Sequence, residues 1–149
     1  MATLKGGEKF VDKLREIAAA IRSADRVQMG FFSHSTYPNG MPVAMIALIQ
    51  DSGAPSRGIP PRPFFRNMIA KNRPTWAPYT ANLLKEKNYD AAATLTALGH
   101  ELEGQLVDSI NATNTPELKK ATIARKGFAK PLVHTGFMRN SVHSEVKTS

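Results

Sequence analysis

Apolar residues recur at helical spacing in two separate stretches of the chain. In residues 8–23, large apolar side chains stand three or four positions apart with charged residues between them, which is typical of an amphipathic helix. Residues 90–112 keep this spacing throughout and predict a second, longer helix. The two apolar stripes are Phe10, Leu14, Ile17, Ala18 and Ile21 in the first stretch, and Leu95, Leu98, Leu102, Leu106 and Ile110 in the second.

In two shorter segments, apolar and polar residues alternate with a period of two, which is the pattern of a half-buried strand. They cover residues 26–34 and 140–147. The spacing within the apolar run 43–50 does not distinguish a helix from a strand, so the residues on either side of it are needed to choose. Pro42 in front suits the first turn of a helix and Gly53 behind suits its end, so we expect a helix.

Prolines interrupt the middle of the chain. Four of them within residues 53–63 predict a stiff, extended loop of polyproline II type. Pro74 and Pro78 then break the helical pattern, which predicts one helix over 63–71 and a separate one over 74–87.

The last third of the chain contains a helix start and a loop. Thr115, Pro116 and Glu117 supply a cap, a first-turn proline and an acid, so a helix is expected from there to Lys126, ending at Gly127. Residues 128–135 read as a loop.

These elements predict an α+β fold rather than an alternating βαβ arrangement. We expect a small antiparallel sheet, formed by the strands 26–34 and 140–147, to pack with four or five helices that include the long helix near 90–112. A chain of 149 residues suits a single domain, 1–149, with residues 1–7 and 147–149 as flexible ends.

Composition and charge narrow the class of protein. Apolar residues make up 42% and charged residues 21%, as in ordinary globular proteins, and cysteine is absent, which excludes disulfides and thiolate metal sites. The net charge of +8 is unevenly distributed. Residues 60–89 carry six basic side chains and one acidic, residues 90–117 carry five acidic and no Lys or Arg, and residues 119–130 carry five basic and no acidic.

Three interpretations of these blocks remain open. The basic blocks could meet nucleic-acid phosphates, or a basic face of one copy could meet the acidic face of the next in a head-to-tail ring. A solvated surface is the third. No apolar run is long enough for a membrane helix, so no membrane partner is expected.

Motifs for catalysis are weak. No two histidines stand four apart, no nucleophile elbow or phosphate loop occurs, and the nearest cluster, His100 and Glu101, suits a solvated helix face better than a metal. We therefore expect neither an enzyme nor a metal or other cofactor. The aromatic residues of the basic stretch could stack on nucleic-acid bases, although packing in the protein core is the favoured interpretation. These residues are Phe64, Phe65, Trp76, Tyr79 and Tyr89.

Four short motifs occur in a recognisable order. They are Ala47-Leu48-Ile49-Gln50-Asp51-Ser52-Gly53, then Ile59-Pro60-Pro61-Arg62-Pro63-Phe64-Phe65-Arg66, then Thr122-Ile123-Ala124-Arg125-Lys126, and finally Pro131-Leu132-Val133-His134-Thr135-Gly136 leading into a strand. Over residues 43–146 this order resembles the tail-completion or neck proteins of long-tailed bacteriophages, which join head to tail.

The resemblance implies a mixed α/β fold, no catalysis and a homo-oligomeric ring, often sixfold, between the head connector and the tail terminator or tube. It implies a place at the head–tail junction of the virion, and in the host cytoplasm during assembly. The ring lumen could also contact DNA non-specifically. The alternatives are a tail terminator or minor tail protein, and, from another class, a non-specific nucleic-acid-binding module.

Three groups of candidate residues follow. The planar guanidinium of Arg62 can donate several hydrogen bonds, either to a partner protein or within the chain to hold the loop in place. Gly136 is expected to permit a turn that Thr135 caps. The loop motif is Gly53, Ile59, Pro60, Pro61, Arg62, Pro63, Phe64 and Arg66; the C-terminal turn motif is Pro131, Leu132, Thr135 and Gly136; the basic block facing DNA or an acidic partner is Lys119, Lys120, Arg125, Lys126 and Lys130.

Overall fold

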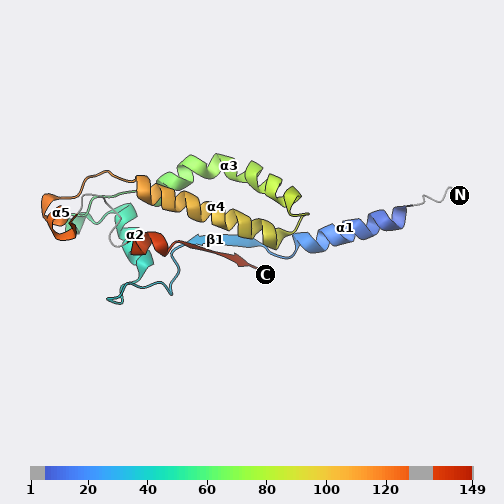
Figure 1. The fold of residues 1–149 in the computed structure, drawn as a ribbon, viewed down its shortest axis with the longest axis horizontal. Helices are drawn as coiled ribbons and strands as arrows, with labels where there is room; N and C mark the ends of the chain where they lie inside the picture. The colour runs from blue at the N-terminus through green and yellow to red at the C-terminus, as the bar shows by residue number, and fades with distance from the viewer. Residues whose placement is uncertain (1–5, 128–135, 149) are drawn as a thin grey trace.

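The computed structural model describes residues 6–127 and 136–148, with the backbone alone at Lys126. This part of the chain is α+β: one two-stranded antiparallel sheet packed with helices (Figure 1). The elements, in order, are α1 Gly7–Ile21, β1 Arg26–Gly30, α2 Val43–Ser52, a 3-10 turn Pro55–Arg57, α3 Phe64–Glu86, α4 Ala91–Ala112, α5 Lys120–Lys126, α6 Phe137–Asn140 and β2 His143–Lys147.

The long helix α4 is the centre of the molecule. It packs against α3 on one side and against both strands on the other, and α1 extends from the end of the body opposite α2 and α5 (Figure 1). Asp90 caps α4 by accepting a hydrogen bond from the backbone N–H of Ala93 at 3.0 Å. The predicted stripe is confirmed, because Leu98, Leu106 and Ile110 are buried.

Close packing of the sheet on α4 depends on one glycine. A Cβ added at Gly99 would lie 2.5 Å from Oγ of Ser144 on β2 and 3.1 Å from Cγ2 of Val27 on β1. The strands pair from Arg26 opposite Lys147 to Gly30 opposite His143. The sequence predicts the strand 26–34, which is too long. Its partner supplies only five paired residues, and the chain turns after Gly30.

The main core lies at the α2 end of the molecule. There α2, α3, α4 and α6 bury their apolar side chains together, and Phe31 meets the ring of Phe64 edge-on at 6.4 Å. Full burial of each such side chain contributes on the order of 1.5–3 kcal/mol. The buried residues of this cluster are Val43, Ala47, Phe64, Met68, Leu106, Ile110 and Met138.

Helix α3 is continuous, and the predicted break into 63–71 and 74–87 is wrong. Pro74 and Pro78 lie inside it. Each proline removes one N–H donor from the helix, which leaves the carbonyls of Ala70 and Pro74 without their usual partners. Both residues are exposed, so that water can hydrate these carbonyls. Packing against α4 holds the helix together, and α3 arches over α4 (Figure 1).

One further helix boundary and one short helix differ from the predictions. Helix α5 begins at Lys120, and the predicted start at Pro116 is wrong because the carbonyls of Pro116 and Glu117 accept hydrogen bonds from Arg62 instead of from a helix. The four-residue α6 was not predicted, and with it the described residues form six α-helices.

The helices α1, α2 and α4 are confirmed, with ends within two residues of those predicted. Gly7 belongs to α1 and Lys147 to β2, although both fall in segments predicted to be flexible ends. The predicted loop 128–135 lies outside the described residues.

Candidate functional site

The loop from Gly53 to Pro63 is a folded turn followed by a short extended segment. Its first half was predicted to be extended, and this is wrong: Ala54 and Ile59 exchange two backbone hydrogen bonds of 2.8 and 3.1 Å around the 3-10 turn. Gly58 makes this closure possible through a left-handed φ of 63°. The segment from Ile59 to Pro63 then leads directly into α3.

Gly53 brings the two ends of this loop together. Its φ is 78°, and a Cβ at this position would lie 2.8 Å from the backbone N of Pro61 and 3.0 Å from the carbonyl oxygen of Ile59. A side chain here would therefore meet backbone atoms, which have little freedom to move. The glycine predicted to end α2 also serves as the point where the loop closes on itself.

Arg62 is buried inside the protein, with 4% of its surface exposed. Its Nε donates to the carbonyl oxygen of Pro116 at 2.9 Å, and its terminal nitrogens donate to Oε1 of Gln50 and the carbonyl oxygen of Glu117, both at 3.4 Å. Burial lowers the pKa of the guanidinium from its ordinary value. Of the two roles expected for Arg62, the structure shows the internal stitch, joining the loop to a segment 54 positions away.

Asp51 organises the start of α3, a role that the sequence did not suggest. Its carboxylate is largely buried and accepts hydrogen bonds from the backbone N–H of Phe65 at 2.9 Å and from Nε of Arg66 at 2.8 Å. An acid at the N-terminus of a helix satisfies free N–H groups and favours the helix dipole. Because this cap comes from the end of α2, no local capping pattern reveals it.

The remaining loop residues divide between core and surface. Phe64 is fully buried, and its carbonyl accepts a hydrogen bond from Oγ of Ser109 at 2.6 Å. Ile59, Pro60 and Pro63 are half-buried, and Pro61 and Arg66 are exposed.

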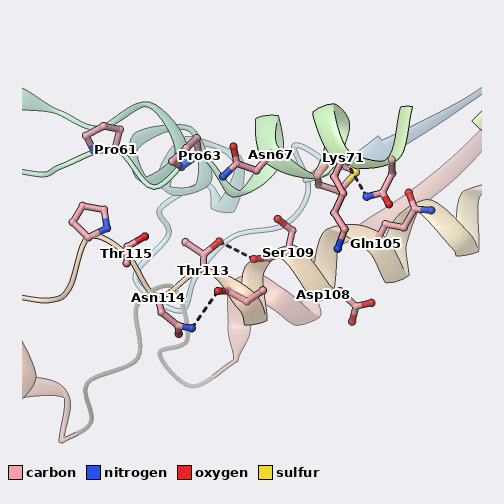
Figure 2. Close-up of a pocket in the computed structure, with 14 residues that line it drawn as sticks. Pro61, Pro63, Asn67, Lys71, Gln105, Asp108, Ser109, Thr113, Asn114 and Thr115 are labelled. Carbon is pink, nitrogen blue, oxygen red and sulfur yellow. Dashed lines mark hydrogen bonds between the residues drawn. The ribbon is translucent and has the colours of Figure 1, made fainter. Parts of the chain in front are cut away.

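A cavity of about 550 Å³ with a mixed polar and apolar lining lies between α3, the end of α4 and the segment after it. Figure 2 shows Asn67 and Lys71 on α3 facing Gln105 and Ser109 on α4, with Thr113 to Thr115 along its lower side. Its lining combines amide, hydroxyl and single charged groups without a concentrated charge, so it indicates no particular ligand.

A more apolar groove of about 700 Å³ lies at the α2 end, between the turn 37–41, α2, the proline loop and α5. Met41, Ile46 and Ile59 supply apolar walls. Lys119 and Arg125, both members of the predicted basic block, line its charged side and are exposed. Glu117 lines it as well, so the groove combines apolar walls with charges of both signs.

Only some of the other predicted site residues are among those that the structure describes. Lys120 is exposed on α5, and Gly136 has a left-handed φ of 71° directly before α6, as expected for a turn glycine. Lys130, Pro131, Leu132 and Thr135, with the expected capping role of Thr135, lie outside the described residues, as does the side chain of Lys126.

The aromatic residues of the basic stretch do not share one surface. Phe64 is in the core, and the indole N–H of Trp76 donates to Oε1 of Gln105 at 2.9 Å, while Tyr79 and Tyr89 are exposed. Among residues 6–127 and 136–148, no group of three His, Asp or Glu side chains is placed to hold a metal ion. No helix of this described part is long and apolar enough to cross a membrane.

Comparisons of the chain with protein families, with curated proteins and with solved structures find no match.

Proposed function

We propose that this protein is a structural virion protein, a subunit of a ring that joins the head connector of a long-tailed bacteriophage to its tail. The observation that carries the proposal is the uncovered apolar stripe of α1. None of the fifteen residues of this helix is buried, and Phe10 is 66% exposed. An apolar face of this kind, held away from its own core, is typical of a subunit completed by other protein chains.

The order of the four motifs supports a phage neck as the assembly that this subunit joins. Asp51 of the first motif accepts a hydrogen bond from Nε of Arg66 in the second, and Ile59 of the second motif lines one groove with Thr122 and Arg125 of the third, so motifs that are distant in the sequence lie together in the fold. This is what we expect if their order reflects a shared fold with neck proteins rather than chance. A tail terminator or minor tail protein is the nearest alternative within the same virion.

A non-specific DNA-binding module is the alternative from another class. The observation in its favour is the group of exposed cations Lys119, Lys120 and Arg125. Phosphate binding by these residues would weaken steeply with salt. The two functions are not exclusive, because a ring lumen crossed by DNA would carry the same cations.

Particle composition and DNA affinity distinguish these functions. We expect mass spectrometry of purified phage particles to detect the protein in a fixed small copy number, and labelled antibodies to mark the junction of head and tail in electron micrographs. Absence from the particles, together with tight and salt-sensitive DNA binding by the purified protein, would overturn the structural role in favour of DNA binding.

A further inference from the structure

We propose that the groove between the turn 37–41, α2, the proline loop and α5 binds a segment of a partner protein in which an acidic residue stands beside apolar residues. We call it the α2–α5 groove; it has a volume of about 700 Å³ and lies at the end of the molecule opposite α1 (Figure 1). The inference does not depend on a ring, because it concerns the chemistry of the bound segment and not the symmetry of the assembly.

A buried positive charge stands in the wall of this groove. Arg62 is 4% exposed, and its three hydrogen-bond acceptors are the neutral oxygens of the Gln50 amide and of the Pro116 and Glu117 carbonyls. In the described part of the chain, no carboxylate lies within 4.0 Å of the guanidinium. The few remaining residues of the sequence contain no Asp or Glu. Because buried charges in proteins are normally paired, this cation favours an anion supplied by another molecule.

Two further cations stand on the α5 side of the groove. Lys119 and Arg125 line it and are exposed, and neither has a carboxylate within 4.0 Å among the residues that the structure describes. Glu117 is the only acidic residue of the described lining. Three cations, including Arg62, therefore face a single carboxylate, and the positive potential that results favours a bound anion. Lysine and arginine side chains form strong, charge-assisted hydrogen bonds with carboxylates.

The walls between these charges are apolar. Four half-buried side chains supply them, from the turn, from α2, from the proline loop and from the segment before α5. Such side chains gain free energy when a ligand removes their exposed part from water. An apolar lining with a few placed polar groups, at this volume, is typical of ligand sites in proteins. The four residues are Met41, Ile46, Ile59 and Leu118.

A peptide fits this combination better than a nucleic acid does. A sugar–phosphate backbone has no apolar side chains for the walls, and the stacking of bases needs a free aromatic face. Tyr37 is the aromatic residue of the described lining, and its ring already packs against Phe137 with centroids 4.9 Å apart. Lys120, the neighbouring exposed cation, does not line the groove, so it distinguishes the groove from a continuous basic patch.

The first test is the selection of a library of random short peptides on the full-length protein. An excess of the double variant K119Q/R125Q stays in solution, so that peptides bound outside the groove are removed. We expect the enriched peptides to carry Asp or Glu beside apolar residues. No enrichment, or enriched peptides without an acid, would overturn the proposal and would leave the neck role, which particle composition tests, unaffected.

The second test measures affinity by fluorescence anisotropy with a labelled synthetic copy of the enriched peptide. K119Q/R125Q should bind it about tenfold more weakly, because two charge-assisted contacts are lost. R57Q/R73Q is the matched control: it removes the same charge from exposed positions outside the groove and should stay within about twofold at physiological salt. E117Q removes the competing carboxylate and should bind several-fold more tightly. Equal losses in the two double variants, or weaker binding by E117Q, would contradict the charge assignment.

Two further comparisons test the apolar walls and the alternative of a phosphate-binding patch. A peptide whose apolar residues are replaced by serine should bind at least about tenfold more weakly, since its apolar contacts with the walls are lost. Unchanged affinity would remove the walls from the site. Displacement of the peptide by a DNA duplex, with K120Q as damaging as K119Q, would replace the groove with a basic patch for phosphates. Circular dichroism of each variant shows that the fold is retained.

Discussion

Replacing Arg62 with alanine removes the side chain that ties the proline loop to residues 116 and 117. The loss includes one well-formed hydrogen bond of 2.9 Å and two long ones of 3.4 Å. Hydrogen bonds made by a charged group contribute about 1.5–3 kcal/mol, and the long ones count for less. Pro116 and Glu117 are exposed, so that water can hydrate the carbonyls that Arg62 leaves.

We therefore expect R62A to lower the free energy of unfolding by about 3 kcal/mol. For a chain of this length each kcal/mol corresponds to a shift of about 2–4 °C, which gives a decrease in melting temperature of about 6–12 °C. The assay is thermal unfolding followed by circular dichroism. R57A is the matched control, because Arg57 lies in the same loop and is exposed.

R57A should change the free energy of unfolding by no more than about 0.5 kcal/mol, as surface substitutions usually do. The reasoning would be refuted if R62A melted within about 2 °C of R57A, since this difference corresponds to less than one hydrogen bond of the expected strength. Arg62 would then contribute little to the folded loop, despite its burial.

G53A should destabilise the protein more than G40A does, because both glycines have φ near 80° but only a Cβ at Gly53 would meet backbone, 2.8 Å from N of Pro61; equal losses in chemical denaturation would remove the close approach as a cause. On α4, G99A should be destabilising because its Cβ would lie 2.5 Å from Oγ of Ser144, whereas G104A, with open space, should gain about 0.4–1 kcal/mol. A stabilised G99A in the same denaturation series would show that the sheet does not pack tightly there. Hydrogen bonds from the backbone N–H of Ala93 and, to a smaller extent, from the hydroxyl of Ser23 hold the pKa of Asp90 below its usual value. The ionised carboxylate therefore stabilises the folded protein above the pKa of the unfolded chain, about 3.9, and this stabilisation is lost as the pH falls through the lower pKa of the folded protein. D90N keeps a capping side chain without the charge and should therefore lose less stability than the natural protein between about pH 5 and pH 2; parallel melting curves across this range would contradict the assignment.

The sequence predicted the elements whose signals are local. The leucine stripe of α4 repeats every three or four residues, and Asp90 stands directly before it, so the helix and its cap were predictable. The helix α2 followed from Pro42 and Gly53 at its ends. In these elements the local signals agree with the packing that the core imposes, since Val43, Ala47, Leu106 and Ile110 are buried there.

Predictions failed where distant residues override local preference. Pro74 and Pro78 normally end a helix, yet α3 continues because it packs against α4 and because Ala70 and Pro74, whose carbonyls lose their helical partners, are exposed residues. The start of α5 shifts to Lys120 because Arg62, 54 positions earlier than Pro116, takes the carbonyls that would open the helix.

The sequence indicated which residues form the candidate site, but not which residues they contact. Arg62 and Gly53 stood out in the sequence, but their partners, Pro116 and Pro61, are defined only by the fold. Asp51 was missed because it caps α3 from the end of another helix. The amphipathic pattern of α1 was evident, whereas its exposure depends on where the rest of the chain places its core.

Joining of heads to tails is tested most directly by electron microscopy of lysates from the phage with this gene disrupted. We predict DNA-filled heads and finished tails that remain separate, or tails of uncontrolled length, with joined particles restored when the intact gene is supplied in trans. Normally joined, infectious particles from the disrupted phage would contradict a role at the head–tail junction.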